Sequence, residues 1–371
     1  MPFGSEGVAD QIGLAMSGGG FRATLFHVGT LRRLVELGLL TRIGRISSIS
    51  GGSIVAGRLA QVWAGLAADP SVANFEKEVA GPLRDFCGRT IDAGAIATGL
   101  LSPFSSAADE IEAEYVKRLF SMTLDQLPDS PVFVIGATNM QTGRSFRFTK
   151  DYMGDYRIGL MPSPKLPLAR AVAASSAFPP VLSPVVIKKP GTFQAVPGAD
   201  LAGNPAFTAT LYLTDGGVYD NLGLETIWNR CATVLVSDAG APFSFDDTVH
   251  TDLVRQTMRA LDIATDQSRG LRKRALVDDF RRKQRAGAYW GIDTAIGDYK
   301  PGTALVCKPE LVVPLARIRT RLNKFSEREQ GELINWGYAL TDAALHAYAP
   351  QLLGQNPPPA QWPIPKWALD R

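Results

Sequence analysis

The stretch 44–66, GRISSISGGSIVAGRLAQVWAGL, predicts a strand, a tight turn and a buried helix in direct succession. The turn consists of Ser50 and two following glycines, and such small neighbours let a serine adopt a strained backbone conformation at the carboxyl end of a sheet. The helix would direct its N-terminal N–H groups at the serine, which favours an oxyanion there. We therefore interpret Ser50 as a nucleophile on a nucleophile elbow. The alternative is an ordinary turn or helix N-cap, where serine is also common.

A second unit of strand, glycine turn and helix precedes this stretch. An apolar strand over 12–17 leads directly into Gly18, Gly19 and Gly20, and a helix with periodic apolar residues follows. Such a loop can hold the pyrophosphate of a dinucleotide, or its N–H groups can hold a transition-state oxyanion. A dinucleotide site requires an acidic residue near the end of the next strand. Here that strand ends in Ser50 with no acid nearby, which favours the oxyanion.

A third feature is the segment 211–217, LYLTDGG, which predicts a strand that ends in Asp215 on a double-glycine turn. We expect this carboxylate on the same edge of the sheet as Ser50, because the functional groups of open parallel sheets gather at the carboxyl ends of their strands. The alternative is a simple Asp-Gly turn, which is frequent in loops.

Histidine is the usual base of a serine hydrolase. The chain has three histidines, and none of them belongs to a recognisable motif: His27, His250 and His346. A dyad in which Asp215 itself accepts the Ser50 proton is therefore the better hypothesis. A carboxylate of ordinary pKa, about 3.9, is a weak base, so we expect Asp215 to be partly desolvated.

Four segments in this order, SGGGFRA, SxSGGS, ARAVAASSAFPPV and DGGVYDNLG, resemble the motifs of the patatin-like phospholipases, which share a Ser-Asp dyad with cytosolic phospholipase A2. The resemblance covers about residues 12–236. It implies Ser50 as nucleophile and Asp215 as general base. The oxyanion and substrate-binding residues that it implies are Gly18, Gly19, Gly20, Arg22 and Gly51. The family pattern is changed at Ser48 and Ala23, where it has glycine.

The function that follows is hydrolysis of carboxylic esters in phospholipids or lysophospholipids, with no metal and no cofactor. Three alternatives are open. A dinucleotide-dependent oxidoreductase would need the missing ribose acid, and a storage or scaffold protein would not need both Ser50 and Asp215. A ligand-activated effector, such as a cyclic-nucleotide-gated antiviral phospholipase, is compatible with the main hypothesis.

Length and composition indicate the class of protein. The 371 residues, 45% of them hydrophobic, can bury a large core. We expect a single α/β domain over 1–371, with a mainly parallel sheet and helices on both faces. Within it, the catalytic motifs occupy 12–236, a helical insertion or lid 68–127, and a helical extension 250–371.

Charge, cysteines and hydropathy restrict the partners. A net charge of +3 gives no support for binding a nucleic acid polymer, and three widely spaced cysteines suggest neither a disulfide framework nor a zinc site. The N-terminal residues lack a signal-peptide pattern, and no run of about 18 apolar residues occurs. We expect a cytoplasmic protein with a lipid substrate, in peripheral contact with the membrane; the oligomeric state is not predicted.

Two further segments have two interpretations each. The basic amphipathic segment 269–285 could contact anionic lipid or a phosphate-bearing activator, or be a solvated helix face. The apolar, glycine-rich segment 91–104 could be a lid, or a loop packed on the core.

Overall fold

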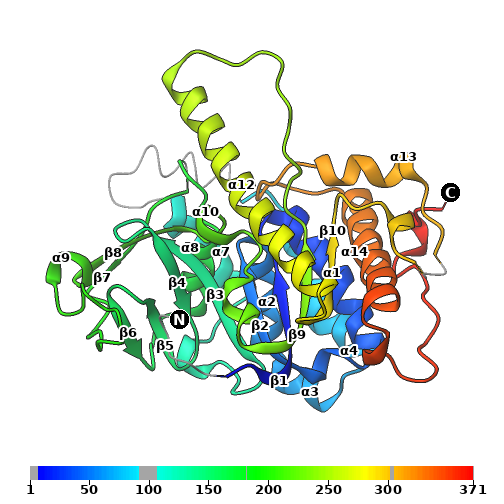
Figure 1. Cartoon of the computed structure of the whole chain (residues 1–371), viewed down its shortest axis with the longest axis horizontal. Helices are drawn as coiled ribbons and strands as arrows, with labels where there is room; N and C mark the ends of the chain where they lie inside the picture. The colour runs from blue at the N-terminus through cyan, green and yellow to red at the C-terminus, as the bar shows by residue number, and fades with distance from the viewer. Residues whose placement is uncertain (1–6, 92–106, 181, 301–304, 371) are drawn as a thin grey trace.

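The computed structural model describes residues 7–91, 107–180, 182–300 and 305–370. Its centre is a ten-stranded mixed sheet with the order β10-β9-β1-β2-β3-β4-β5-β6, in which β8 also pairs with β3 and β7 pairs with β8 (Figure 1). The strands are β1 (Ala9–Met16), β2 (Ile43–Ile49), β3 (Val132–Asn139), β4 (Arg144–Phe148), β5 (Tyr152–Asp155), β6 (Gly159–Pro162), β7 (Val185–Lys188), β8 (Thr210–Asp215), β9 (Cys231–Asp238) and β10 (Ala286–Gly291).

The sheet has a parallel part and an antiparallel part. Strands β10, β9, β1, β2 and β3 run parallel to one another. Beyond β3, the strands β4, β5 and β6 are antiparallel, and so are the pairs β3 with β8 and β8 with β7. The predicted α/β class with mostly parallel central strands is confirmed, and the antiparallel part extends it at one side.

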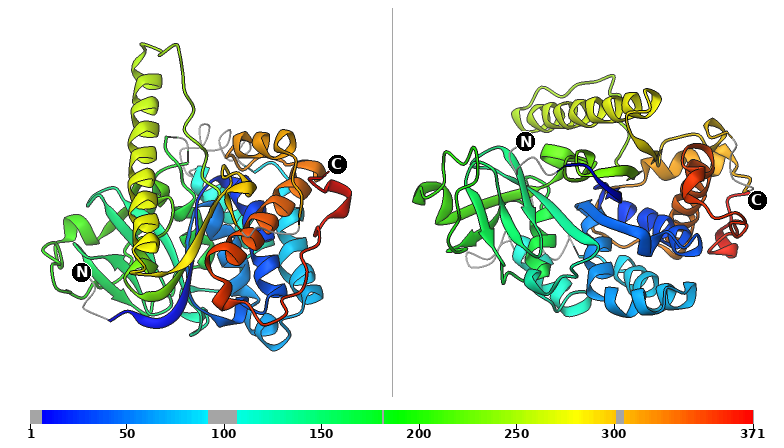
Figure 2. Two further views of the ribbon diagram at one scale, coloured as in Figure 1. Left: turned by 45° about the vertical axis from the view of Figure 1, so that its right-hand side comes forward. Right: turned by 60° about the horizontal axis from the view of Figure 1, so that its bottom comes forward.

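Helices cover both faces of the parallel part (Figure 2). One face carries α1, α2 and α14, and the other carries α11 and α12. The helices are α1 (Gly20–Glu36), α2 (Gly51–Gln61), α3 (Trp63–Ala68), α4 (Val72–Phe75), α5 (Gly81–Cys87), α7 (Ala107–Arg118), α8 (Leu168–Ser175), α9 (Pro205–Thr208), α10 (Gly217–Asp220), α11 (Glu225–Trp228), α12 (Leu253–Arg281), α13 (Pro309–Val312) and α14 (Glu327–Tyr348).

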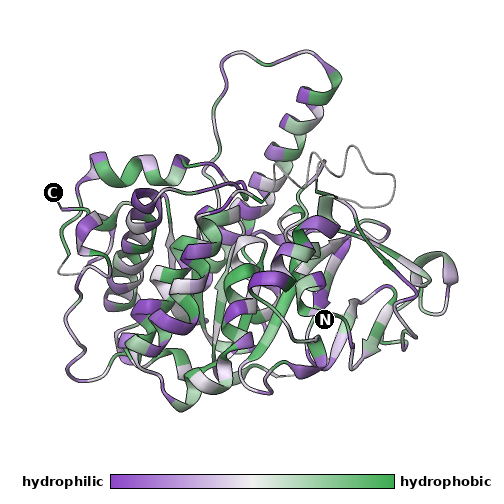
Figure 3. Ribbon diagram, turned by 180° about the vertical axis from the view of Figure 1, so that it is seen from behind, coloured by the Kyte–Doolittle hydropathy of each residue, from purple (hydrophilic) through white to green (hydrophobic). Residues whose placement is uncertain are grey.

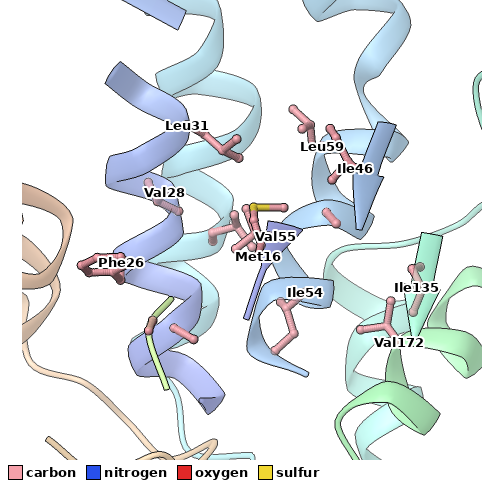
Figure 4. Packing of buried hydrophobic residues seen from close by; sticks show 14 of the residues in the cluster. Met16, Phe26, Val28, Leu31, Ile46, Ile54, Val55, Leu59, Ile135 and Val172 are labelled. Carbon is pink, nitrogen blue, oxygen red and sulfur yellow. The ribbon is translucent and has the colours of Figure 1, made fainter. Parts of the chain in front are cut away.

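The side chains of β1 alternate between two hydrophobic cores, as the period of a strand requires. Leu14 and Met16 lie in the main core, whereas Ala15 lies in a smaller core on the opposite face. Figure 4 shows Met16 close to side chains of α1 and α2, among them Val28 and Val55. Burial on both faces explains why this strand appears in the sequence as a continuous apolar run.

Helices α1 and α14 pack with their backbones in close approach. A Cβ added at Gly29 would overlap the carbonyl of Ile334, and one at Gly337 would overlap the carbonyl of Phe26. Positions 29 and 337 therefore require glycine because a side chain would not fit between the two helices.

The structure bears on two sequence-based predictions, the helical insertion 68–127 and the apolar segment 91–104. The described parts of 68–127 are mostly helical, but the apolar segment 91–104 lies, apart from Ile91, outside the described residues. Within the part of the chain that the structure describes, the helices are either too short or too polar to cross a lipid bilayer.

Substitution at the α1–α14 contact tests the close approach. We expect Gly29→Ala and Gly337→Ala each to lower the free energy of unfolding by about 2 kcal/mol or more, because overpacking forces the backbones apart. Gly65→Ala in α3 is the control, since an added Cβ there meets none of the described residues within 4 Å. Alanine at that exposed helical position should be neutral or slightly stabilising. Urea denaturation measures all three, and wild-type stability of Gly29→Ala would contradict the packing.

Candidate active site

The site forms where two strands end against each other along one edge of β3. β2 pairs with the first part of this edge, up to Ile49 opposite Gly136, and β8 pairs with its continuation, beginning with Asp215 opposite Ala137. The other edge of β3 is occupied by β4. Because β8 runs antiparallel to β3, its carboxyl end points at the carboxyl end of β2. Ser50, the residue after β2, therefore meets Asp215.

This arrangement corrects one step of the sequence argument. The prediction that Asp215 lies on the same edge of the sheet as Ser50 was based on parallel strands, but β8 is antiparallel to its neighbours. The two carboxyl ends meet because β8 overlaps β3 at only three paired positions before it stops.

Ser50 has the backbone conformation of a nucleophile elbow. It is the N-cap of α2, with φ 50° and ψ −119°, and its side chain makes no capping hydrogen bond. Positive φ is strained for a residue with a Cβ and is maintained only where the surroundings enforce it. The neighbouring turns leave no space for larger residues, because a Cβ at Gly51 would overlap the Gly20 carbonyl and one at Gly52 the Met16 carbonyl. The alternative of an ordinary capping serine is thus disfavoured.

Asp215 is a buried carboxylate whose surroundings raise its pKa. It is only 2% exposed, and its Oδ1 accepts a 2.6 Å hydrogen bond from the Gly217 N–H. Burial raises the pKa of Asp215 to about 7, although the Gly217 N–H and a hydrogen bond with the Ser50 side chain both act to lower it. The expected desolvation is present, and the Ser50 hydroxyl lies close enough to the carboxylate to influence its pKa.

The end of α8 holds both halves of this pair. Ser175 Oγ accepts a 2.9 Å hydrogen bond from the Ser50 N–H and donates one of 2.6 Å to the Gly136 carbonyl. The Ser175 carbonyl accepts from the Gly216 N–H, and the Ala177 carbonyl accepts from the Asp215 N–H. The sequence-based analysis predicted no role for Ser175 or Ala177, although both belong to the motif ARAVAASSAFPPV.

The glycine loop lies beside the serine with its amides in two different states. The Gly18 N–H is bonded to the Asn221 carbonyl at 3.1 Å, so this amide is not available to an oxyanion, contrary to the prediction. For Gly19 and Gly20, which both have positive φ, the structure records no N–H partner among the described residues. These two amides, together with that of Gly51 at the start of α2, are the available donors.

Arg22 has a structural position and not the predicted substrate-binding one. Its guanidinium is buried, 1% exposed, and donates hydrogen bonds of 2.7–2.8 Å to the carbonyls of Ala239, Ala316 and Ile318. It therefore ties the start of α1 to the segment after β9 and to the chain before α14. The residues lining the cavity do not include it.

A cavity of about 610 Å³ opens over the pair. One part of its wall is apolar, and another part is a face of α12 that carries charges of both signs. The apolar lining includes Phe178, Pro179, Leu182, Phe243 and Leu322, and the lining on α12 consists of Arg259, Asp262, Thr265, Asp266 and Arg269. Phe178 and Pro179 belong to the run ARAVAASSAFPPV, whereas Phe243, Leu322 and the α12 residues come from segments beyond the motifs.

All three histidines belong to the described residues, and none of them lines the cavity. His27 is fully buried, with hydrogen bonds to Ser237 Oγ at 2.8 Å and to the Ser17 carbonyl at 2.9 Å. Burial lowers the pKa of His27 to about 4, against the effect of the Ser17 carbonyl, so the ring is neutral at pH 7. His250 contacts Arg255, and His346 contacts Asp342.

Part of the basic segment 269–285 is engaged within the protein. Arg269 binds the buried Asp238 at 2.7 Å, and Arg272 lies 3.5 Å from the Asp220 carboxylate. Lys273 lies over the Tyr289 ring, and Arg285 donates to the Cys231 carbonyl. Contact of this segment with anionic lipid or a phosphate-bearing activator stays a prediction.

The raised pKa of Asp215 has a consequence for stability. A carboxyl group with a higher pKa in the folded than in the unfolded state costs stability above its unfolded pKa, and the cost disappears as the pH falls toward that value. The shift from 3.8 to about 7 corresponds to about 4 kcal/mol at pH 8. We expect Asp215→Asn to be more stable than wild type at pH 8 by up to this amount, and the gain to shrink toward pH 4.

Urea denaturation at pH 8 and pH 5 measures this difference. Asp200→Asn is the control, because Asp200 forms an exposed pair with Arg157 that lowers its pKa, so its removal should give no such gain. An Asp215→Asn variant with wild-type stability at both pH values would contradict the desolvation of the carboxylate.

Comparison with known proteins places this geometry in a family. The family model described as patatin-like phospholipase matches residues 14–228, which is more than half of the chain and includes the glycine loop, the elbow and Asp215. No curated protein matches the chain in sequence.

Solved structures show the same fold. Human GIVD cytosolic phospholipase A2 is similar over 90% of this chain and 58% of that chain, with a TM-score of 0.52 and 14% sequence identity. The same human protein in complex with methyl gamma-linolenyl fluorophosphonate is similar over 90% of this chain and 57% of that chain, with a TM-score of 0.50 and 16% identity. This chain thus spans less than two thirds of the human protein. It belongs to the patatin-like phospholipase family, a family of ester-bond hydrolases.

Proposed function

We propose that the protein is a serine lipid acyl hydrolase, which cleaves carboxylic esters of phospholipids or lysophospholipids with Ser50 as nucleophile and Asp215 as general base. The observation that carries the proposal is that these two side chains lie side by side at the floor of one cavity. A serine at positive φ contacts a buried carboxylate whose pKa burial raises to about 7, and both line one cavity. A base of that pKa is half ionised near neutral pH and is a much stronger proton acceptor than an ordinary aspartate.

In the acylation step, Asp215 accepts the proton of the Ser50 hydroxyl while Oγ attacks the ester carbonyl carbon. The carbonyl oxygen becomes an oxyanion, which the N–H groups of Gly19, Gly20 and Gly51 stabilise. The starts of α1 and α2 lie together here and add the positive ends of two helix dipoles. Collapse of the tetrahedral intermediate transfers the proton from Asp215 to the leaving alcohol, and the acyl group remains on Ser50.

Deacylation uses the same groups, with a water molecule in place of the Ser50 hydroxyl. Asp215 accepts a proton from a water molecule, the hydroxide attacks the acyl carbon, and the same amides hold the second oxyanion. The fatty acid leaves, and the proton returns to the Ser50 oxygen. Neither step uses a histidine.

The cavity wall supports an amphiphilic substrate. The apolar side chains around Phe178 and Leu322 suit an acyl chain, and the charged face of α12 around Arg259 and Asp266 suits a polar head group. Activation by a ligand, as in an antiviral effector, stays a prediction. The dinucleotide alternative is less well supported, because the Gly18 amide is already bonded to Asn221 and the loop adjoins a nucleophile elbow.

Covalent labelling tests the nucleophile. A fluorophosphonate, the class of inhibitor bound in the similar human phospholipase structure, should modify Ser50 and no other residue. We expect Ser50→Ala and Asp215→Asn each to lower kcat by at least about 10³-fold on a soluble ester, and the double variant to be little worse, because groups that act as a unit are not additive.

The controls for this experiment are His250→Gln and His346→Gln, since His250 is exposed and His346 is half-buried. Both variants should retain most of the activity. Mass mapping of the label onto a different serine, or loss of turnover in a folded His250→Gln variant, would show that the mechanism is wrong.

The pH dependence tests the base. Because only the ionised carboxylate can accept the serine proton, kcat/KM for a soluble ester should rise with pH and reach half its maximum near pH 7, where Asp215 titrates. A profile measured from pH 5 to pH 9 checks this. A half-maximum near pH 4, the value of an ordinary aspartate, would contradict the assignment.

A further inference from the structure

The two most exposed large apolar side chains of the described chain, Phe245 and Leu253, lie on one projection. The loop 239–252 between β9 and α12, together with the N-terminal half of α12, extends away from the body of the molecule (Figures 1 and 2). Four large apolar side chains there are largely in solvent. We call them the apolar tip: Phe245 (93% exposed), Leu253 (80%), Val254 (67%) and Val249 (59%). Figure 3 shows hydrophobic and hydrophilic residues together on this projecting half of α12.

The same loop forms part of the catalytic cavity. Residues 240–244 line the cavity that contains Ser50, and the Phe243 ring contacts that of Phe245 with centroids 6.0 Å apart. Arg259 fixes this part of the loop to α12, because it donates a 2.8 Å hydrogen bond to the Ser244 carbonyl and lies over the Phe243 ring. The apolar tip is therefore in contact with the cavity wall through the edge-to-face packing of the Phe243 and Phe245 rings.

We propose that the apolar tip inserts into the surface of a zwitterionic phospholipid layer and so brings the cavity next to its substrate. This proposal rests on the proposed function, since it requires that the substrate be a lipid. Aromatic and aliphatic side chains at the end of a projection are suited to the boundary between head groups and acyl chains. The cavity wall that follows would then face the layer from which an acyl chain must enter.

The charges around the apolar tip favour a zwitterionic over an anionic surface. Three carboxylates lie beside it, those of Asp246, Asp247 and Asp252, against the two guanidinium groups of Arg255 and Arg259. Anionic lipid would repel this net negative charge, whereas zwitterionic head groups offer both an ammonium and a phosphate.

A second protein copy is a poorer occupant for geometric reasons. A stable protein interface usually needs about 20–30 residues on each side, and the apolar tip offers four large apolar side chains on a narrow projection. Insertion into a lipid surface requires only a few apolar side chains.

The basic segment 269–285 occupies the other half of the helix and the turn after it, where several of its residues are already engaged with the body of the protein. The two modes of membrane contact respond differently to salt. Binding through basic residues to anionic lipid weakens as salt screens charges. Binding through apolar side chains does not.

Vesicle sedimentation with the full chain tests the proposal. Binding to phosphatidylcholine vesicles is measured in a Ser50→Ala background, which leaves the lipid intact. We expect the double substitution Phe245→Ser with Leu253→Ser to lower the vesicle partition coefficient by about 100-fold or more, because two large apolar side chains lose their burial. The control is Val116→Ser with Val313→Ser, which removes two exposed apolar side chains outside the apolar tip and should change binding less than about twofold.

Activity is measured separately, with Ser50 intact. The tip variant should hydrolyse a short soluble ester as fast as wild type, since neither substituted residue lines the cavity, and should lose turnover on phosphatidylcholine vesicles. Vesicle binding of the wild type should persist in 1 M NaCl.

Several results would overturn the proposal. One is a tip variant that binds vesicles as tightly as the unsubstituted chain, and another is an unsubstituted chain that does not bind them. A third is an equal fall of the partition coefficient in the tip and control variants. The last is binding that requires anionic lipid and disappears in 1 M NaCl. A smaller particle mass for the tip variant in light scattering, with vesicle binding unchanged, would assign the apolar tip to a second copy instead. If the wild type cleaves no ester but still binds vesicles through the apolar tip, the proposed function fails and the membrane contact stands.

Discussion

The pairing of two strand ends along one edge of β3 is the constraint on which the site depends. β2 and β8 run along this edge from opposite directions, and both end at its middle, opposite Gly136 and Ala137. The residue that leaves β2 and the last residue of β8 are thereby forced together. A register shift of one residue in either strand would turn the side chain to the other face of the sheet. The precision of the site is thus a property of backbone hydrogen bonding, reinforced by Ser175 and Ala177.

The same arrangement carries two costs in stability. Ser50 is held at positive φ, and the Asp215 carboxylate is held out of water, with the Gly217 N–H as its hydrogen-bond donor and the Ser50 hydroxyl beside it. Each cost is tolerable because the surrounding core is large and the backbone N–H groups of Ser50 and Asp215 are both hydrogen-bonded, to Ser175 and Ala177. The cost and the proposed chemistry have one cause, because the desolvation that destabilises the carboxylate also makes it a base.

Outside the family motifs, α12 contributes to three parts of the molecule. Its body-side half is anchored by the buried pair of Arg269 and Asp238 and by Leu276, the only buried residue of the helix. Its middle forms a charged wall of the cavity, and its beginning carries part of the apolar tip. One helix therefore connects the core, the proposed substrate cavity and the proposed lipid contact.

The sequence by itself determined the local units. The α/β class, the glycine loop, the elbow at Ser50 and the acid at Asp215 could all be recognised because a tight turn between a strand and a helix is specified by adjacent residues. The histidines could be set aside for the same reason, since none had a local motif.

Only the tertiary structure decided how these units meet. The antiparallel direction of β8, the role of Ser175, the bonded state of the Gly18 amide and the inward position of Arg22 all depend on contacts between segments far apart in the chain. Such contacts are fixed by strand register and packing, and no short pattern of residues records them.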